Sequence, residues 1–472
     1  MSLTPMTRTS PGPSFGLLPL PAATLEILAR LGYHAMTPIQ AASLPIALAG
    51  HDLIARAKTG TGKTAAFALV LLSNLKPGSR GVQALVLCPT RELADQVSTE
   101  IRRLARAEEN IRVLTLCGGT PTRPQVASLE RGAHVVVGTP GRVLDHLARG
   151  SLKLDALNTL VLDEADRMLD MGFFNDIASI AGACPAARQT MLFSATYPDG
   201  IAQLSQRFLR SPQEVQLLEQ HAPTKIRQVF YRVSERERLE AVTLLLEHYR
   251  PVSTLAFCNT RQQCRDLLAL LQARGFVALA LHGELDQIER DQVLIQFANR
   301  SCSVLVATDI AARGLDIAQL EAVINVDVTP EPEVHIHRIG RTGRVDEVGW
   351  ALSLASKRDQ EYVSRIEAAQ GVVEWQELST LRARSREPLV PPMATLQILG
   401  GRKEKMRAGD VLGALTASAG FSAAQIGKIN VNEFSTYVAV ERGIAALALS
   451  KLSAGKVKGR NVKVRILEGN PR

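Results

Sequence analysis

The chain has 472 residues, 46% of them hydrophobic and 21% charged, and a formal net charge of +9. A chain of this length and composition is expected to form two or three domains, which excludes a disordered or collagen-like polypeptide. Its apolar runs, such as AAFALVLL, are too short to span a bilayer, and residues 1–20 lack the continuous apolar segment of a secretory signal. We therefore expect a cytoplasmic protein without a membrane partner.

The first predicted elements are apolar strands that alternate with helical patterns. They run from DLIAR to QTMLFSAT, with VQALVLC, IRVLTL, HVVVGT and TLVLD between them. Strands buried in a parallel sheet are apolar throughout, as these are. The βαβ series predicts a parallel sheet with helices on both faces, which we place at residues 1–217.

The strand signal lapses near residues 219–224 and then a second series begins. It runs from IRQVFYRV to ALSLAS, with STLAFCNT, FVALALHG, SVLVATDI and AVINVD between them. We therefore expect a second α/β domain of similar size at residues 218–378. The following stretch, LRARSREPLVPPM, is rich in Arg, Ser and Pro, and we interpret residues 379–393 as an exposed linker.

The last predicted elements follow a different order. Strand, helix, strand, strand, helix and strand patterns succeed one another, which predicts a small βαββαβ domain at residues 394–468. Residues 391–472 contain 13 Lys and Arg against 5 Asp and Glu, a net charge of +8. A localised positive potential attracts polyanions, above all nucleic acids. On charge alone, a solvated basic surface that only increases solubility is the alternative.

The stretch ARAKTGTGKT, residues 55–64, follows a candidate strand and opens a helical pattern. Glycines at positions 60 and 62 let the backbone turn tightly enough to direct N–H groups at phosphate oxygens, and the helix dipole adds to the attraction. In such a loop Lys63 reaches the β- and γ-phosphates, and Thr64 places its hydroxyl on Mg²⁺. A glycine-rich turn without chemical function is the alternative.

The stretch TLVLDEAD, residues 159–166, places an acidic residue at the end of a buried strand. Burying a carboxylate is costly unless it faces a cation, so Asp163 is a candidate Mg²⁺ ligand. Glu164 beside it is placed to accept a proton from an attacking water. The alternative is a helix N-terminus with acidic residues in its first turn, which would have a similar sequence.

The second α/β series contains HRIGRTGR, residues 337–344, with arginines at 338, 341 and 344. Guanidinium groups pair bidentately with phosphate oxygens, so this cluster suits the γ-phosphate of a nucleotide. A phosphate loop in one domain and an Arg cluster in the other imply one composite site. A basic surface turn punctuated by glycine is the alternative.

Taken together and in order, these motifs resemble the DEAD-box RNA helicase family over nearly the whole chain. GYHAMTPIQ resembles the Q motif that reads adenine, PTREL and TPGR resemble RNA-backbone motifs, and SAT resembles the link between ATP hydrolysis and strand separation. The resemblance implies two RecA-like domains, ATP and Mg²⁺ as cofactors, and an RNA-dependent ATPase that closes over ATP and a bent single strand. His335 stands where many members have an aromatic residue.

The resemblance also implies site residues. The expected ATP contacts are Phe15, Tyr33, Gln40, Thr59, Gly60, Thr61, Gly62, Lys63, Thr64, Asp309, Arg341 and Arg344. Mg²⁺ would be held by Thr64 and Asp163, and the expected catalytic residues are Glu164, Lys63, Asp163, Arg341 and Arg344. The expected RNA contacts of the two helicase domains are Pro89, Thr90, Arg91, Gly119, Thr139, Gly141, Arg142, Gln287, Arg290 and Thr308. The residues expected to couple ATP hydrolysis to unwinding are Asp166, Ser194 and Thr196.

The βαββαβ domain is similar to an RNA-recognition motif, but the sheet face on which such modules stack bases offers only one aromatic residue, Tyr437. We therefore expect RNA to be recognised by charge and shape. The expected contacts are Arg402, Lys403, Lys405, Arg407, Lys428, Tyr437, Lys456, Lys458 and Arg460.

The stretch from Gly400 to Val431 resembles the C-terminal domain of the bacterial DbpA subfamily. That resemblance implies binding to a hairpin of 23S rRNA near the peptidyl-transferase centre, action on pre-50S particles in large-subunit assembly, and no DNA partner. The alternatives are a general RNA chaperone without rRNA specificity and an ATP-gated RNA clamp.

Overall fold

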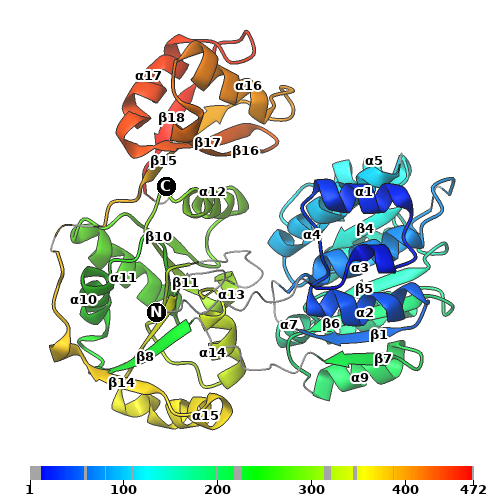
Figure 1. Ribbon diagram of the computed structural model, residues 1–472, viewed down its shortest axis with the longest axis horizontal. Helices are drawn as coiled ribbons and strands as arrows, with labels where there is room; N and C mark the ends of the chain where they lie inside the picture. Colours follow the sequence, from blue (N-terminus) through cyan, green and yellow to red (C-terminus); the bar gives the residue numbers. More distant parts are fainter. Residues whose placement is uncertain are drawn as a thin grey trace, which may run out of the picture. The chain divides into compact units, whose positions relative to one another are not determined.

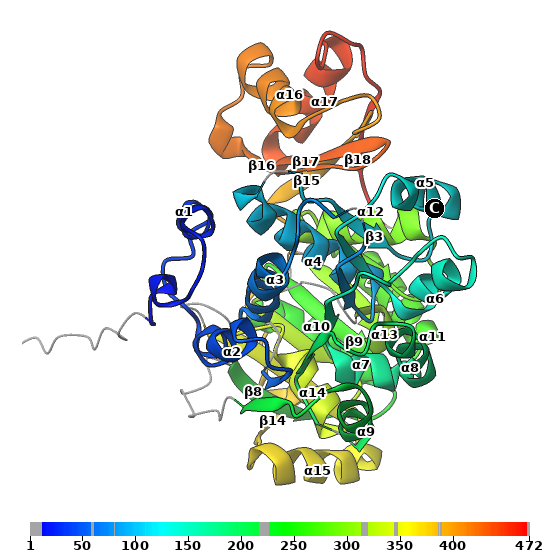
Figure 2. The ribbon, with the colours of Figure 1, turned by 90° about the vertical axis from the view of Figure 1, so that its right-hand side faces the viewer.

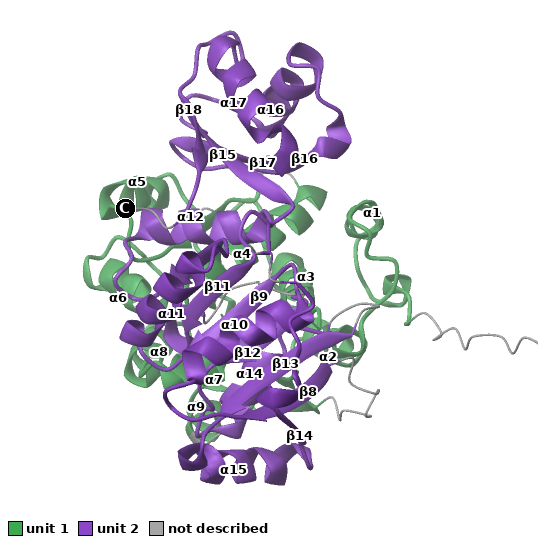
Figure 3. Cartoon of the chain, turned by 90° about the vertical axis from the view of Figure 1, so that its left-hand side faces the viewer, with its two compact units in different colours: residues 1–220, 314–316 green, residues 221–313, 317–472 purple. Residues whose placement is uncertain are grey.

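The computed structural model describes residues 12–57, 61–79, 81–108, 110–197, 199–216, 226–312, 320–343, 348–385, 387 and 389–469. The chain divides into two compact units, residues 1–220 with 314–316 and residues 221–313 with 317–472 (Figure 3). The expected break near residues 219–224 lies outside the described residues. Among the helices in these ranges, none has the length and apolar character needed to cross a membrane.

The described part of the first unit contains a sheet of seven parallel strands in the order β3-β4-β2-β5-β6-β1-β7 (Figure 1). The strands are β1 (Leu53–Arg56), β2 (Ala84–Leu87), β3 (Val113–Leu116), β4 (Val135–Gly138), β5 (Thr159–Leu162), β6 (Gln189–Ser194) and β7 (Gln213–Gln216). The helices are α1 (Ala22–Arg30), α2 (Pro38–Leu48), α3 (Lys63–Ser73), α4 (Arg91–Leu104), α5 (Thr122–Glu130), α6 (Pro140–Ala148), α7 (Ala165–Asp170), α8 (Phe174–Gly182) and α9 (Asp199–Phe208). The expected parallel sheet is therefore confirmed.

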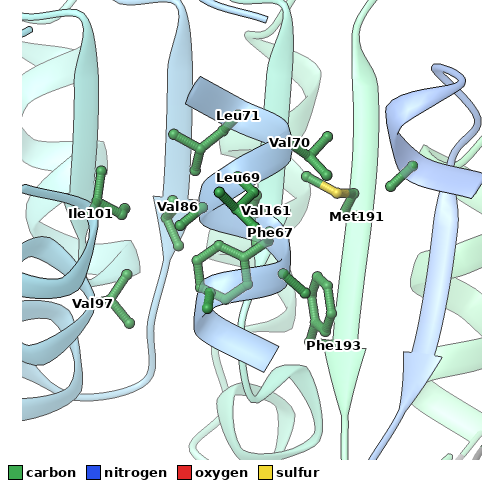
Figure 4. Close-up of a cluster of buried hydrophobic side chains, with 14 of the residues drawn as sticks. Phe67, Leu69, Val70, Leu71, Val86, Val97, Ile101, Val161, Met191 and Phe193 are labelled. Carbon is green, nitrogen blue, oxygen red and sulfur yellow. The ribbon is translucent and has the colours of Figure 1, made fainter. Parts of the chain in front are cut away.

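Helices cover both faces of this sheet because successive strand residues point to opposite sides. In β1, Leu53 and Ala55 join a core with α1 to α4, whereas Ile54 joins a second core with α6 to α9. Figure 4 shows the first core, where the rings of Phe67 on α3 and Phe193 on β6 lie 5.3 Å apart between centroids. Helix α3, which carries the phosphate-loop lysine at its start, is thus held firmly against the sheet.

The described part of the second unit begins with another seven-stranded parallel sheet, in the order β10-β11-β9-β12-β13-β8-β14. The strands are β8 (Ile226–Arg232), β9 (Thr254–Cys258), β10 (Ala278–Leu281), β11 (Val304–Thr308), β12 (Ala322–Asn325), β13 (Gly349–Ala355) and β14 (Glu374–Glu377). The helices are α10 (Arg238–Tyr249), α11 (Arg261–Ala273), α12 (Gln287–Ala298), α13 (Asp309–Ala312), α14 (Pro332–Ile339) and α15 (Gln360–Gln370). If β8 is counted as strand 1 of this sheet, its strand order is 3-4-2-5-6-1-7, which is the order in the first unit.

The second unit ends with a small antiparallel sheet in the order β16-β17-β15-β18, with α16 and α17 on one side of it (Figure 2). Its elements are β15 (Met393–Leu399), α16 (Ala408–Gly413), β16 (Ile426–Val431), β17 (Ser435–Glu441), α17 (Ala445–Ala454) and β18 (Val464–Leu467). The core between sheet and helices is formed by Leu396, Ile398, Val438, Val440 and their neighbours. The predicted βαββαβ order is confirmed.

Two features differ from the expectations. The edge strands β7, with the sequence QEVQ, and β14, with EWQE, have no continuous apolar run and were not predicted. The stretch expected to be an exposed linker packs against the second sheet domain, because Leu381 and Leu389 are buried in that domain's core. In addition, the guanidinium of Arg250 donates a hydrogen bond to the carbonyl oxygen of Glu387 at 2.9 Å.

Candidate functional site

The phosphate loop and the acidic motif meet at one edge of the first sheet. The loop follows β1, Asp163 follows β5, and Ser194 ends β6, and these three strands are neighbours in the order β5-β6-β1. Because parallel strands end at the same edge, the three motifs lie side by side. In open α/β sheets this carboxyl edge is where ligands bind.

Lys63 is the first residue of α3 and is buried, with 6% of its surface exposed. Its Nζ donates a hydrogen bond to the carbonyl oxygen of Ala57, the residue after β1, at 2.8 Å. The ammonium group is therefore held inside the loop, where a triphosphate would enter. Gly62 and Thr64 flank Lys63, and Thr61 precedes Gly62, whereas Thr59 and Gly60 lie outside the described residues.

The Q-motif glutamine is bonded directly to the phosphate loop. Gln40 on α2 is fully buried, its Nε2 donates to the carbonyl oxygen of Gly62 at 3.0 Å, and its Oε1 accepts from the N–H of Thr37 at 2.9 Å. Gly62 has φ +95°, and a Cβ there would lie 2.6 Å from Gln40 Nε2. The glycine is thus required both for its backbone angle and for the approach of the glutamine.

The two aromatic residues assigned to the Q motif pack together next to this helix. The rings of Phe15 and Tyr33 meet edge to face with centroids 6.5 Å apart, and Phe15 is 3% exposed. The hydroxyl of Tyr33 donates to Glu100 on α4 at 2.7 Å. Burial and this bond raise the pKa of Tyr33 to about 12. These contacts hold both residues in place, and part of the Tyr33 side chain remains exposed to solvent.

Asp163 is 2% exposed, and burial raises the pKa of its carboxyl group to about 7, although the nearby Lys63 ammonium acts in the opposite direction. Its Oδ1 is buried and has no hydrogen-bond partner among the described residues. A buried carboxylate oxygen without a donor fits a cation ligand. The next residue, Glu164, has φ +51° and its carboxylate lies 3.0 Å from the Arg167 guanidinium.

Asp166 joins the acidic motif to the SAT motif. Its Oδ2 accepts hydrogen bonds from the N–H of Ala195 at 3.2 Å and from both the N–H and the hydroxyl of Thr196 at 3.0 Å. The hydroxyl of Ser194 donates to the carbonyl oxygen of Thr196 at 2.6 Å, and the carbonyl oxygen of Ser194 accepts from the N–H of Ala57 at 3.0 Å. A continuous set of bonds therefore links the acidic motif, the SAT motif and the start of the phosphate loop.

The motifs assigned to RNA follow β2, β3 and β4, which form the other half of the same sheet edge. Thr90 caps α4 by accepting from the N–H of Leu93, and Arg91 donates to the carbonyl oxygen of Gly118 at 3.4 Å. Arg142 on α6 donates to the carbonyl oxygen of Thr120 at 3.1 Å. The remaining predicted contacts of this unit lie on the same loops and helix starts: Pro89, Gly119, Thr139 and Gly141.

Two residues that the sequence did not single out organise this RNA half. Gln125 on α5 donates to the carbonyl oxygen of Cys117 at 3.1 Å and to the hydroxyl of Thr120 at 2.8 Å. Its Oε1 lies 2.9 Å from both the Arg142 guanidinium and Nε2 of His146. His146 is fully buried, and burial lowers the pKa of its imidazole. No local sequence signal marks these two residues, because their partners come from other elements.

In the second unit, the first arginine of HRIGRTGR does not face a ligand. Arg338 is 2% exposed and forms a bidentate pair with Asp309, with N–O distances of 2.7 and 2.6 Å. It also donates to the carbonyl oxygen of Asp327 at 2.6 Å. Arg338 therefore fixes the position of Asp309. Arg341 is 7% exposed, and Arg344 lies outside the described residues.

The other motif residues of this unit lie at the carboxyl ends of β10 and β11. Arg290 on α12 donates to the carbonyl oxygen of Ala311 on α13 at 2.7 Å, and Gln287 donates to Asp291 at 2.7 Å. Thr308, the last residue of β11, is 8% exposed. The bond from Arg290 joins α12 to α13, the helix that begins with Asp309.

The basic residues of the small C-terminal domain gather at one end of its sheet. Arg402, Lys403, Lys405 and Arg407 lie on the loop after β15, and Lys456, Lys458 and Arg460 lie on the loop after α17. The two loops touch, since Lys458 Nζ donates to the carbonyl oxygen of Lys405. All seven side chains are exposed, as is Lys428 on β16.

Tyr437 does not form part of this exposed surface. It is 3% exposed, and its hydroxyl accepts a hydrogen bond from Gln397 at 3.3 Å. On the same face, Thr395 is fully buried and its hydroxyl accepts from the Asn299 amide of the preceding sheet domain at 3.2 Å. The expectation of an RNA contact at Tyr437 is therefore corrected, because the sheet face that stacks bases in RNA-recognition motifs is covered.

Comparison with known proteins agrees with this geometry. Residues 37–204 match the DEAD/DEAH box helicase family, residues 236–346 match the helicase conserved C-terminal domain, and residues 395–466 match the DbpA RNA binding domain. Two RecA-like sheets that carry these motifs define an ATP-dependent RNA helicase of the DEAD-box class. Within this class, the chain belongs to the DbpA subfamily of DEAD-box RNA helicases.

The relatives cover most of the chain. The ATP-dependent RNA helicase DbpA of Escherichia coli (strain K12) is 49% identical over 95% of this chain and 98% of that protein. The ATP-dependent RNA helicase CshA of Listeria monocytogenes serovar 1/2a is 44% identical over 72% of this chain and 65% of that protein.

Two solved structures are similar to about three quarters of the chain. Dbp5 of S. cerevisiae, bound to RNA and ADP BeF3, has a TM-score of 0.71 and 29% identity, covering 77% of this chain and 96% of that chain. Mss116p, bound to ssRNA and AMP-PNP, has a TM-score of 0.67 and 28% identity, covering 76% of this chain and 77% of that chain.

Proposed function

We propose that this helicase is held on a hairpin of 23S rRNA by its C-terminal domain and unwinds neighbouring RNA during assembly of the large ribosomal subunit. The observation that carries this proposal is the exposed basic end of the C-terminal domain, formed by two touching loops. Its match to the DbpA RNA binding domain supports RNA as the ligand. With the sheet face covered, recognition rests on phosphate contacts and on bases presented by a folded RNA.

The ATP site is proposed at the phosphate loop of the first unit. Lys63 neutralises the β- and γ-phosphates, Gln40 reads the adenine, and Phe15 and Tyr33 pack beside it.

The residues for Mg²⁺ and for the attacking water lie at the same loop. The buried Asp163 Oδ1, which has no hydrogen-bond partner among the described residues, and the Thr64 hydroxyl fit Mg²⁺, which when bound neutralises charge that develops on the phosphates. Glu164 accepts the proton of the attacking water.

The second unit completes the ATP site in this proposal. Asp309, oriented by Arg338, contacts the nucleotide, and Arg341 and Arg344 stabilise charge on the γ-phosphate. A positioned arginine raises phosphoryl-transfer rates by about 10³-fold or more. Hydrolysis then depends on RNA because RNA engages the motifs of both units.

The RNA path of the helicase core is proposed along the loops after β2, β3 and β4 and along α12. Thr90, Arg91, Gly119 and Arg142 offer backbone N–H groups, a hydroxyl and guanidinium groups to phosphates. Gln287, Arg290 and Thr308 provide the corresponding contacts in the second unit. The structure of Dbp5, which is similar over 77% of this chain, is bound to RNA and ADP BeF3, and this supports both ligands for the core.

The test is the ATPase rate with 23S rRNA, its isolated hairpins, bulk tRNA and single-stranded DNA at a fixed salt concentration, because salt alone changes phosphate binding strongly. We expect one hairpin to activate at the lowest concentration and DNA not to activate. Equal activation by tRNA and by every 23S fragment would favour a general RNA chaperone.

A matched pair of variants tests the role of the C-terminal domain. Lys456→Gln with Arg460→Gln removes two exposed charges from the basic loops, whereas Lys357→Gln with Arg358→Gln removes two exposed charges from the second sheet domain. We expect only the first variant to lose hairpin preference, with the ATPase rate at saturating poly(A) RNA unchanged. An intact preference in the first variant would contradict the proposal.

A further inference from the structure

The C-terminal domain carries an exposed aromatic side chain that its fold does not use. Phe434, in the turn between β16 and β17, is 59% exposed and lies outside the hydrophobic core of this domain. In the described ranges, it is the one aromatic residue whose side chain is exposed. Leaving a phenyl ring in water forgoes the stabilisation that its burial would supply, and the exposed ring is accessible to a ligand.

The ring lies directly against the basic loops. Nζ of Lys403 is 4.2 Å from the centroid of the Phe434 ring and 3.0 Å from the Glu433 carboxylate. A cation over one side of an aromatic ring is attracted to it and keeps the ring oriented. Phe434 is thus an exposed aromatic surface within the basic end of the domain.

The backbone holds the turn and the loop together. The N–H groups of Arg402 and Lys403 donate to the carbonyl oxygens of Asn432 and Glu433 at 2.9 and 3.1 Å. A Cβ at Gly401 would lie 2.4 Å from the carbonyl oxygen of Asn432, so only glycine permits this approach. The backbone of the turn that carries Phe434 is therefore fixed next to the backbone of the loop that carries Lys403.

We propose that Phe434 is a stacking site for one unpaired base of the bound RNA, with the phosphates on either side of that base held by Lys403 and its basic neighbours. This inference rests on the proposed binding of RNA at the basic end of the domain. Bases of single-stranded loops stack on exposed aromatic rings, and the surrounding cations bind the backbone. The covered face at Tyr437 leaves Phe434 as the aromatic surface that an incoming base meets first.

The experiment uses the full-length protein and fluorescence anisotropy with a labelled 23S rRNA hairpin at several salt concentrations. Phe434→Ala and Phe434→Leu are expected to weaken binding at least about fivefold at every salt concentration, because both lose the aromatic face. Phe434→Tyr is expected to bind within about twofold of the parent protein, because its ring also stacks. Lys403→Gln should instead reduce the salt dependence by about one unit of slope, as expected for a phosphate contact.

A blunt-ended RNA duplex serves as the control ligand, and its affinity should be the same in the parent and Phe434→Ala. Unchanged hairpin affinity in Phe434→Ala and Phe434→Leu would overturn the proposal. So would a loss seen only with pre-50S particles and not with naked RNA, since the partner would then be a protein. If the parent itself shows no hairpin preference, the proposed function fails, and the same variants measured on plain single-stranded RNA still decide the stacking site.

Discussion

The carboxylate of Asp166 accepts two hydrogen bonds from Thr196, one from the N–H and one from the hydroxyl, each 3.0 Å long. Asp166 belongs to α7, which follows β5, and Thr196 follows β6, so this pair joins the ends of two neighbouring strands. The acidic motif of the ATP site and the SAT motif therefore cannot shift independently. We propose this pair as a route by which a change at the nucleotide reaches the adjoining segment.

Removing the Thr196 hydroxyl should separate ATP hydrolysis from unwinding. In Thr196→Val the shape is kept but one hydrogen bond to a carboxylate is lost, an effect of about 1.4 kcal/mol or tenfold. We expect duplex unwinding per ATP hydrolysed to fall about tenfold, with ATP affinity within about twofold of the parent protein. Strand-displacement and ATPase assays on the same samples measure both quantities. Thr196→Ser, which keeps the hydroxyl, should behave like the parent.

Gln125 should be required for RNA binding by the first unit. Gln125→Met keeps the side-chain volume but leaves Arg142, His146 and the carbonyl oxygen of Cys117 without this partner. Because these groups are largely buried, we expect a loss of about 2 kcal/mol in unfolding free energy and a several-fold increase in the RNA concentration for half-maximal ATPase activity. Arg123→Gln, an exposed change on the same helix, is the control. An unchanged RNA requirement in Gln125→Met would show that these loops are held by other contacts.

The second sheet domain should lose stability in mild acid because of His335. This side chain is fully buried beside Phe230, and burial lowers its pKa to about 4 from an ordinary 6.5. Between these pH values the unfolded chain binds a proton that the folded domain does not, so stability is present above pH 6.5 and falls as pH decreases towards 4. The full effect of such a shift is about 3 kcal/mol.

Denaturant unfolding followed by tryptophan fluorescence between pH 7 and 5 measures this dependence. The two tryptophans, Trp350 and Trp375, lie on β13 and β14, so the signal reports on this domain. His335→Phe removes the titrating group and should flatten the pH dependence. A parent protein and a variant with equal slopes would contradict the assignment.

Arg442 should fix the C-terminal domain to the preceding sheet domain. Its guanidinium donates to the carbonyl oxygens of Pro391 at 2.7 Å, Met393 at 3.0 Å and Ser301 at 3.3 Å. We expect Arg442→Ala to broaden the distance distribution between spin labels on the two domains. Hairpin affinity should stay within about twofold, because Phe434 and Arg442 lie at opposite ends of β17, about 25 Å apart along the strand.

Unwinding provides the functional readout for Arg442. A duplex attached to the hairpin should be unwound more slowly by Arg442→Ala, whereas a free duplex should be unaffected. Arg442→Lys keeps the charge but not the planar group that reaches several carbonyl oxygens, so it should resemble Arg442→Ala. Normal unwinding of the attached duplex by both variants would argue against a positioning role.

The sheets and the nucleotide motifs were predictable because their signals are local. Apolar strands mark β1 to β6, and Gly62 and Lys63 sit between a strand and a helix. What the sequence could not predict depends on contacts between distant segments. The roles of Gln125 and Arg338 come from partners on other elements, and the burial of Thr395 comes with hydrogen bonds to Asn299 and Ser301 of another domain. The edge strands β7 and β14 escaped prediction because short polar strands resemble loops.

The covered face of the C-terminal sheet has a consequence for protein engineering. Thr395 forms buried hydrogen bonds with Asn299 and Ser301 of the preceding sheet domain. The position of the C-terminal domain therefore depends on these two residues. If the C-terminal domain were fused to another helicase that lacks those two residues, the junction would be exposed to water. The domain would then be connected by a flexible linker, and the linker length alone would limit its distance from the helicase core. A chimaera that also carries residues 296–303 should instead hold the bound RNA at a fixed distance and angle from the helicase core.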